Sequence, residues 1–268
     1  MKKNPLIFAH YDRQGELRLD TQNLLEELSQ YFAPIIFVST KMNQRNVDKI
    51  PGNISIIIRE NIGYDFYSYR EGLSHLTKGF IESFNYENIS FMNSSFYCGD
   101  CKKIVTKYHS GITRNNFDLV GLTMHKGAVD TPPHVQSYLF TLSKEVIRNP
   151  SVLEWWKHML PINDRNIVIQ KYEIGLSKLI SDCGFDLKSL YVKSLPYRLK
   201  KVFLKPLIKI KKIFGYSKYV RVPSPIHEDF TNIYDIYGIV KIEIICNNSM
   251  NAIRLLGLNK ETTRHLCQ

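Results

Sequence analysis

Short apolar runs that alternate with helical segments constrain the fold of this chain more than any other feature of its sequence. Residues 5–12 (PLIFAHYD), 35–40 (IIFVST) and 54–60 (ISIIIRE) are almost continuously apolar, as strands buried on both faces of a parallel sheet are. Between the first two runs, residues 19–32 place apolar side chains at helical spacing. This alternation predicts an α/β fold built on a mainly parallel sheet flanked by helices.

The alternation continues toward the C-terminus. Asp20 and Thr21 can cap the helix predicted over 19–32. A second helix follows the third strand and runs to about Leu76. Further strands are predicted at 88–95, 117–123 and 137–143, with helices at 101–108, 144–158 and 166–183.

Polar side chains cluster just beyond the ends of the predicted strands. In open α/β sheets, ligands bind in the crevice outside the carboxyl ends of the strands. The sequence therefore predicts one binding site along that edge of the sheet. The strand-end residues are His10, Asp12, Ser39, Thr40, Asn61, Asp65, Asn93, Ser94 and Ser95.

The segment ENIGYDFYSYREGL (residues 60–73) combines a turn-like entrance with several aromatic side chains. Gly63 permits a tight turn, and Asn61 and Asp65 can either fasten the loop or contact a ligand. Asp65 can equally cap the helix that follows. Capping alone leaves Asn61, Gly63 and the aromatic residues unexplained, so we interpret the segment as a strand-to-helix junction beside a ligand.

A family resemblance rests on the order and spacing of several segments. IFAHYD, ENIGYDFYSYREGL and FMNSSFYCG are followed by HVQSYLFTLSKEVI, WWKHM, IQKYEIGLSKLISDCGF and SPIHEDFTNIYDIYGIVKIEIICNN. This series resembles the rhamnan-synthesis F family of polysaccharide glycosyltransferases. The resemblance covers nearly the whole chain except a basic insert near the C-terminus.

The resemblance implies a GT-A-like, Rossmann-related fold and an inverting hexosyltransferase of the rhamnosyltransferase type. Such an enzyme would move L-rhamnose or another deoxyhexose from a nucleoside diphosphate, such as dTDP-rhamnose, to a lipid-linked surface polysaccharide such as lipopolysaccharide O-antigen. The implied donor site comprises His10, Tyr11, Asp12, Asn61, Gly63, Asp65, Asn93, Ser94 and Ser95.

The expected metal dependence follows from one departure within this resemblance. Asn93-Ser94-Ser95 stands where GT-A enzymes usually carry Asp-x-Asp and where the family typically shows Asn-Asp-Ser. A hard cation such as Mg²⁺ or Mn²⁺ prefers charged oxygen ligands, and no carboxylate follows until Asp100. We therefore assign no metal ligand and expect weak or absent dependence on a divalent cation. Two interpretations of the missing carboxylate are open. The turn binds the donor through neutral hydrogen bonds, or the chain is a catalytically inactive scaffold.

Glu173 is the predicted catalytic base. Direct attack of a sugar hydroxyl on an anomeric carbon needs a group that removes the proton as the bond forms. YEIGLSKLISDCGF is similar to the helix that supplies this carboxylate in inverting GT-A enzymes, and Glu173 opens it. A solvated glutamate favoured by the helix N-terminus is the alternative. Asp130 and Asp164 are the other candidates for the base.

The loop between residues 121 and 140 carries polar side chains on the expected binding face. These side chains could hold the acceptor or neutralise the leaving diphosphate, although single histidines often serve only as hydrogen-bonding residues. The candidates are His125, Lys126, His134 and Gln136.

The net charge of +11 is confined to one segment. Residues 187–227 hold eleven basic residues and no acid, and outside them the 25 acids are balanced. Within 196–216, apolar and basic positions alternate at helical spacing, which is typical of a helix lying on an anionic membrane surface. An ordinary surface helix and a phosphate-backbone-binding patch for nucleic acid are the alternatives. The predicted membrane residues are Lys200, Lys201, Phe203, Lys205, Lys209, Lys211, Lys212 and Phe214.

Three segments are expected: a nucleotide-sugar-binding core (1–186), the basic amphipathic insert (187–222) and a C-terminal segment that packs back on the core (223–268). No run is long enough to span a bilayer, and the start MKKNPLIFAHYD is too short for a signal peptide. We expect a cytoplasmic protein, peripheral on the inner face of the plasma membrane. Its five cysteines are then expected as reduced thiols, including Cys98 and Cys101.

Overall fold

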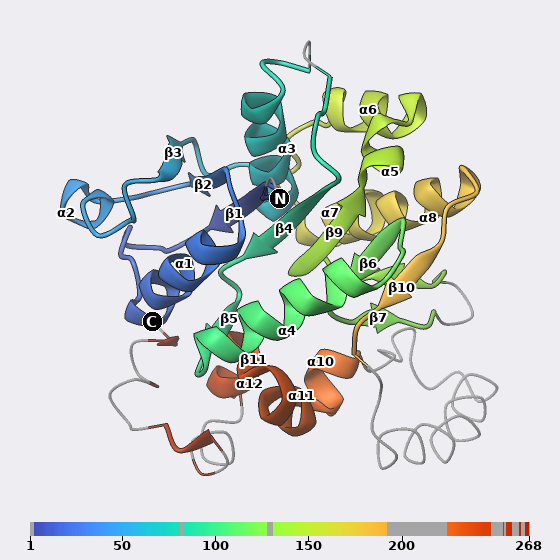
Figure 1. Ribbon diagram of the computed structural model, residues 1–268. Coiled ribbons are helices and arrows are strands. Elements are labelled where there is room, and N and C mark those ends of the chain that lie inside the picture. Colours follow the sequence, from blue (N-terminus) through green and yellow to red (C-terminus); the bar gives the residue numbers. More distant parts are fainter. Residues whose placement is uncertain are drawn as a thin grey trace.

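The fold is organised around a seven-stranded sheet with the strand order β10-β6-β9-β4-β1-β2-β3 (Figure 1). The computed structural model describes residues 3–80, 83–127, 131–191 and 224–247, together with 254, 256–258, 263, 266 and 267. The expected α/β fold on a mainly parallel sheet is confirmed, because only β9 runs antiparallel to its neighbours. The strands are β1 (Leu6–His10), β2 (Ile35–Ser39), β3 (Ile54–Ile58), β4 (Asn88–Asn93), β6 (Leu119–Gly121), β9 (Leu139–Ser143) and β10 (Leu187–Ser189).

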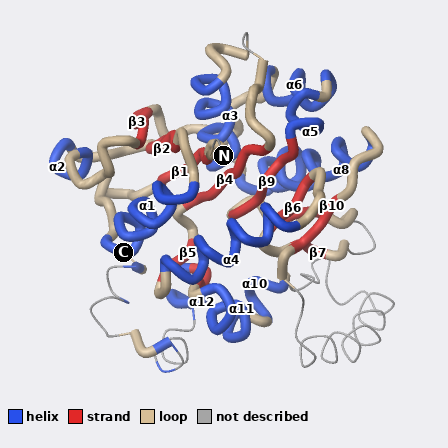
Figure 2. The backbone as a smooth tube through the Cα atoms, viewed as in Figure 1, coloured by secondary structure: helices blue, strands red, loops and turns tan. Residues whose placement is uncertain are grey.

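Helices cover both faces of this sheet (Figure 2). Apolar side chains of β1 point alternately to one face and the other, so both faces must be covered. Leu6 and Phe8 point into one core, and Ile7 and Ala9 point into the other. Burying both faces explains why β1 and β2 are apolar up to their last residues, His10 and Ser39. The first core is closed by α1 (Leu19–Tyr31), α4 (Cys101–Arg114) and α11 (Phe230–Tyr237), and the second by α3 (Tyr64–Leu76), α5 (Lys144–Arg148), α6 (Pro150–Lys157) and α8 (Gly175–Asp182).

Shorter elements complete the described part of the chain. Two small antiparallel ladders join β5 to β11 and β7 to β8. Figure 1 shows the C-terminal helices gathered beside α4 and β5. These elements are β5 (Phe96–Cys98), β7 (Met124–His125), β8 (His134–Val135), β11 (Ile239–Lys241), α2 (Gln44–Val47), α7 (Arg165–Val168), the π-helix η1 (Ile169–Ile174), α10 (Pro225–Glu228) and α12 (Ile242–Asn247).

The structure corrects three expectations about the elements. β3 is an edge strand with partly exposed residues, so it is not buried on both faces. The helix predicted over 144–158 is two helices, because Asn149 has extended backbone angles and caps a new helix that begins at Pro150. The segment expected as one helix over 166–183 contains the π-helical turn η1.

The cysteine expectation is partly wrong. Cys246 and Cys267 form a disulfide, whereas Cys98, the last residue of β5, and Cys101, the first residue of α4, are free thiols. The separation of 21 residues in sequence gives no sign of this pairing.

The sheet extends beyond the expected core boundary at residue 186. β10 pairs in parallel with β6 and forms the edge of the sheet opposite β3. Within the described ranges, no helix combines the length and the apolar character needed to cross a membrane. All eight predicted membrane residues lie in the segment 192–223, outside the described residues.

Candidate active site

A large cleft lies along the carboxyl ends of β1 and β4, and we call it the strand-end cleft. Its volume is about 1920 Å³. Eight of the nine residues predicted to bind the donor line it, and the ninth, Asn93, lies directly behind. The eight are His10, Tyr11, Asp12, Asn61, Gly63, Asp65, Ser94 and Ser95.

Asp65 and Asn93 meet across the sheet edge. The Asn93 side-chain amide donates to Asp65 Oδ2 at 2.7 Å, and Asn93 Oδ1 accepts from the backbone N–H of Ser95 at 3.1 Å and from its hydroxyl at 2.5 Å. Asp65 makes no capping bond to α3, so the capping alternative is wrong. Burial raises the pKa of the Asp65 carboxyl, and Lys241 and Arg59 oppose that shift.

Gly63 explains the turn in ENIGYDFYSYREGL. Its φ of +74° is a conformation that glycine adopts at low cost. A Cβ there would lie 2.6 Å from Tyr67 Cβ and 2.9 Å from Pro161 Cα. The Gly63 N–H donates to Asn163 Oδ1 at 2.9 Å. Tyr64 lines the cleft, whereas Phe66 and Tyr69 are buried in the core that α3 covers.

His10 is a buried, neutral residue at the floor of the cleft. Its Nδ1 lies 2.9 Å from Ser39 Oγ, and that hydroxyl donates to the Lys41 carbonyl at 2.7 Å. Ser39 therefore accepts, and His10 Nδ1 carries the proton. Burial, followed by the charge of Arg18, lowers the pKa of His10 to about 4.

Asp12 organises the loop that follows β1. Its Oδ1 accepts from the backbone N–H groups of Gln14 and Glu16 at 2.8 and 2.9 Å. The carboxylate thus stabilises the rim of the cleft as an Asx-type turn, with the ring of Tyr11 51% exposed beside it.

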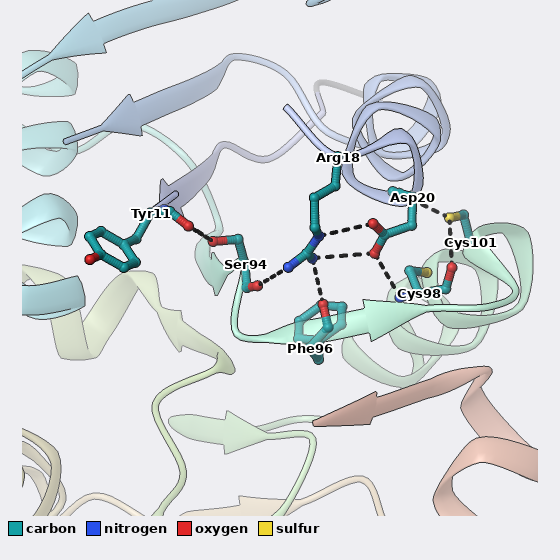
Figure 3. Close-up of polar contacts among 7 residues, drawn as sticks. All are labelled: Tyr11, Arg18, Asp20, Ser94, Phe96, Cys98 and Cys101. Atoms are coloured by element: carbon teal, nitrogen blue, oxygen red, sulfur yellow. Dashed lines mark hydrogen bonds and ion pairs between the residues drawn. The ribbon is translucent and has the colours of Figure 1, made fainter. Parts of the chain in front are cut away.

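Arg18 and Asp20 hold the turn after β4 through contacts with Ser94, Phe96 and Cys98, as Figure 3 shows. Arg18 donates to the carbonyls of Ser94 at 3.2 Å and Phe96 at 2.8 Å, and its Nε pairs with Asp20 at 3.0 Å. Asp20 also accepts from the Cys98 N–H at 3.0 Å. The expectation that Asp20 caps α1 is therefore wrong, because α1 has no side-chain cap. Sequence reasoning missed Arg18, since nothing in its neighbours points to carbonyls 76 residues away.

Lys241 was also missed. It is the last residue of β11, and it lines the cleft with its Nζ 2.5 Å from Ser95 Oγ and 4.6 Å from the centre of the Tyr138 ring. Burial lowers the pKa of Lys241 to about 8, against the opposing charges of Asp65 and Glu173. The only sequence signal is a lysine in an apolar strand, which many surface strands also show.

Glu173 does not line the strand-end cleft. On η1, its Oε2 accepts from the backbone N–H of Ser137 at 2.8 Å and from the Ser137 hydroxyl. Its other oxygen lies 3.8 Å from His134 Nε2, and the carboxylate is 17% exposed. We call Glu173, Ser137 and His134 the Glu173 cluster.

Of the four residues predicted to contact the acceptor or the diphosphate, His134 belongs to this cluster and His125 contacts it. The rings of His125 and His134 stack at 4.9 Å, and His134 Nδ1 donates to the Pro132 carbonyl at 2.9 Å. Gln136 accepts from the Thr123 hydroxyl at 2.8 Å, and Lys126 is exposed. None of these four lines the strand-end cleft.

The two other predicted bases have different positions. Asp164 caps α7 by accepting from the N–H groups of Asn166 at 2.8 Å and Ile167 at 3.0 Å. Asp130 lies outside the described residues. Among the residues that the structure describes, no group of three His, Cys, Asp or Glu side chains gathers in a way that could hold a metal ion.

Comparison with known proteins gives one family match. The family described as "Rhamnan synthesis protein F" matches residues 35–211 of the 268. The "Uncharacterized protein y4gN" of Sinorhizobium fredii (strain NBRC 101917 / NGR234) is 28% identical over 190 residues, which are 69% of this chain and 48% of that protein. The chain thus spans about half the length of this curated relative.

Solved structures with a related fold are distant. CMP:2-keto-3-deoxy-manno-octonic acid synthetase complexed with CTP is 10% identical, with a TM-score of 0.43 and coverage of 79% of this chain and 100% of that one. The mannosyltransferase PcManGT from Pyrobaculum calidifontis, in complex with GDP-Man and Mn²⁺, is 8% identical, with a TM-score of 0.40 and coverage of 70% and 55%. The glycosyltransferase GlyE of Streptococcus pneumoniae TIGR4 is 10% identical, with a TM-score of 0.39 and coverage of 90% and 54%.

Proposed function

This chain belongs to the rhamnan synthesis protein F family, and from that premise we propose that it is a glycosyltransferase whose nucleoside diphosphate donor binds in the strand-end cleft. The observation that carries the proposal is the cleft itself. Side chains that were predicted to bind a donor because they follow strands come from distant parts of the chain, and they line one cavity. Open α/β sheets bind ligands at this edge.

The proposed donor carries L-rhamnose or another deoxyhexose on a nucleoside diphosphate, with dTDP-rhamnose as the first choice. The support is the family's connection to the synthesis of rhamnan, a polymer of rhamnose. The proposed acceptor is a growing surface polysaccharide on a lipid carrier. The basic segment 187–222 would then hold the enzyme at the inner face of the membrane where such an acceptor lies.

The proposed reaction is a direct, inverting displacement. The acceptor hydroxyl oxygen forms a bond to the anomeric carbon while the bond from that carbon to the diphosphate oxygen breaks. The hydroxyl proton passes to a carboxylate, and the electron pair of the broken bond stays on the diphosphate. We propose Glu173 as that carboxylate.

The position of Glu173 defines what this role requires. The Ser137 N–H and hydroxyl occupy one carboxylate oxygen, so the other, facing His134, would take the proton. The negative charge of Glu173 raises the pKa of Lys241, against the effect of burial, and it also raises the pKa of Asp65. The charge of Glu173 therefore acts on both of these charged groups of the cleft.

The test is a titration of the protein with dTDP, UDP and GDP, followed by a transfer assay with the matching nucleotide sugars. We expect one nucleoside diphosphate to bind with a Kd below about 1 mM, and its sugar nucleotide to support transfer. Absence of binding by all three would overturn the proposal. Binding without transfer to any glycan acceptor would instead favour the inactive scaffold.

The membrane part of the proposal has its own test. Flotation with vesicles that contain anionic lipid is compared with binding to an oligonucleotide of matched charge. We expect association with the vesicles. Tight oligonucleotide binding without flotation would favour the nucleic-acid alternative for the basic segment.

A further inference from the structure

We propose that Lys241 is a built-in cation that binds the diphosphate of the donor. This inference rests on the proposed function, because it names the residue that would receive the charged part of that donor. It concerns a residue from the C-terminal segment, 146 positions away from its partner Ser95.

Pairing of β11 with β5 carries Lys241 to the cleft. Lys241 lies opposite Phe96 in the antiparallel register, and the N–H of Ile242 donates to the Ser95 carbonyl at 3.2 Å. These backbone contacts fix the base of the lysine beside the turn that follows β4. Its side chain therefore reaches the cleft from a strand rather than from a loop.

A directed chain of hydrogen bonds then orients the ammonium. Asn93 donates to Asp65, and the Ser95 hydroxyl donates to Asn93 Oδ1. The Ser95 oxygen must accept from Lys241, since its single proton is already used. One of the three ammonium N–H groups is occupied in this way, which leaves the others for a ligand.

The turn that holds Ser95 is fixed from its other side. Arg18 bonds the carbonyls of Ser94 and Phe96, the two residues that flank Ser95 (Figure 3). The Ser94 hydroxyl accepts from the Tyr11 N–H at 3.1 Å. A preorganised donor of this kind does not have to be reordered when charge develops near it.

The charge of Lys241 is incompletely balanced within the cleft. Arg18 pairs with Asp20, and Arg165 lies 3.7 Å from Glu243. Among the described residues, no carboxylate lies within 4.0 Å of Lys241 Nζ. Burial of an ammonium without a close carboxylate is unfavourable, and the lowered pKa of about 8 expresses that cost. A bound anion would supply the missing partner.

The chemistry of a donor diphosphate fits this position. When the bond between sugar and diphosphate breaks, negative charge grows on the leaving oxygen. The ammonium stabilises that charge by hydrogen bonds and keeps its own protons, so no proton transfer is required. Lys241 would therefore supply positive charge beside Asn93-Ser94-Ser95, a turn that has neutral side chains.

The test compares Lys241→Gln with the wild type by calorimetric titration with dTDP, UDP, GDP, the matching nucleosides and inorganic pyrophosphate. We expect the affinity for the bound nucleoside diphosphate and for pyrophosphate to fall about ten- to hundredfold, because a charge-assisted hydrogen bond is lost. The affinity for the nucleoside should change less than about twofold. A purely structural lysine would weaken diphosphate and nucleoside together, and that result would overturn the inference.

Two variants keep the test decisive. Lys107→Gln makes the same change of charge on the exposed face of α4, away from the cleft, and should leave every affinity unchanged. Lys241→Arg keeps the positive charge and should recover part of the diphosphate affinity. If Lys241→Gln does not fold, Ser95→Ala removes the hydroxyl that bonds both Lys241 and Asn93 Oδ1, and should weaken diphosphate binding a few-fold.

The outcomes separate this inference from the proposed function. If the wild type binds a nucleoside diphosphate and Lys241→Gln binds it within about twofold, the Lys241 assignment is wrong and the function stands. If the wild type binds pyrophosphate through Lys241 but no nucleoside diphosphate, the anion site stands and the donor assignment fails. If the wild type binds neither, both are overturned.

Discussion

The strand-end cleft and the Glu173 cluster differ in how their polar groups are satisfied. In the cleft, the chain from Asp65 through Asn93 and Ser95 ends at the Lys241 ammonium, which keeps N–H groups free for a ligand. In the cluster, the Glu173 carboxylate is already bound by Ser137. The first region is built to receive an anion, whereas the second must open or share its hydrogen bonds before it can act on a substrate.

Replacing Glu173 tests whether the closed cluster takes part in the chemistry. If Glu173 is the base, Glu173→Gln keeps the shape and should lower the transfer rate about 10²- to 10⁴-fold, or roughly 3 to 5 kcal/mol of barrier. Nucleoside diphosphate affinity should stay nearly constant, because the interaction forms mainly in the transition state. The measurement is the transfer rate beside the Kd of the same variant.

The control for this prediction is Glu154→Gln on α6. Glu154 is exposed and pairs with Lys157 at 3.4 Å, so its replacement should not change the rate. An unchanged rate for Glu173→Gln would make the cluster structural and would direct the search for the base to Asp130 and Asp164.

Gly63 tests how tightly the turn beside the cleft is built. Gly63→Ala places a side chain at a positive φ and against Pro161 Cα, so the free energy of unfolding should fall by about 2 to 4 kcal/mol. Gly184→Ala is the matched control, because Gly184 also has a positive φ, +85°, but no atom would contact its Cβ within 4 Å. It should cost about 1 kcal/mol. Urea unfolding measures both, and equal losses would contradict the close approach at Gly63.

His10 makes the stability of the cleft floor depend on pH. Its pKa is about 4 in the folded protein and 6.5 in the reference state, so the unfolded chain binds more protons between these values. The free energy of unfolding should fall as the pH drops from 6.5 to 4, by up to about 3 kcal/mol from this residue. Arg18 favours the neutral ring and Asp12 opposes it, so burial supplies the largest part.

The pH prediction is checked by comparing unfolding curves of the wild type and His10→Asn at both ends of this range. The variant should lose most of the dependence of the free energy of unfolding on pH. A smaller pH dependence should remain from His109, because burial also lowers the pKa of that residue. His75→Asn, at an exposed position on α3, should keep the full slope. A wild-type slope in His10→Asn would show that His10 is not the titrating group.

Chelation of divalent cations is expected to have the smallest effect. The turn Asn93-Ser94-Ser95 offers neutral ligands, and Lys241 supplies a fixed positive charge beside it. Treatment with EDTA should change the transfer rate less than about twofold. Loss of activity in EDTA with recovery in Mn²⁺ would contradict this. Asp100, which lines the cleft while capping α4, would then be the first carboxylate to examine.

The sequence alone determined the alternation of elements and the residues at the strand ends. β1 and β2 are apolar because both of their faces are buried, so composition and order were enough to predict a mainly parallel sheet. Parallel strands place their carboxyl ends at one edge, which is why Asp12, Asp65 and Ser94 could be expected in one cleft before any contact was known.

Only the tertiary structure decided which partner each polar group has. Asp20 and Asp65 could cap helices locally, but each instead bonds a residue distant in the chain, because buried polar groups take whichever partner the fold brings within reach. Lys241 reaches Ser95 through a strand pairing that no local pattern encodes, and Glu173 meets Ser137 in the same way. Local sequence reports backbone preference and burial, whereas the electrostatic environment of the cleft depends on contacts between residues far apart in the chain.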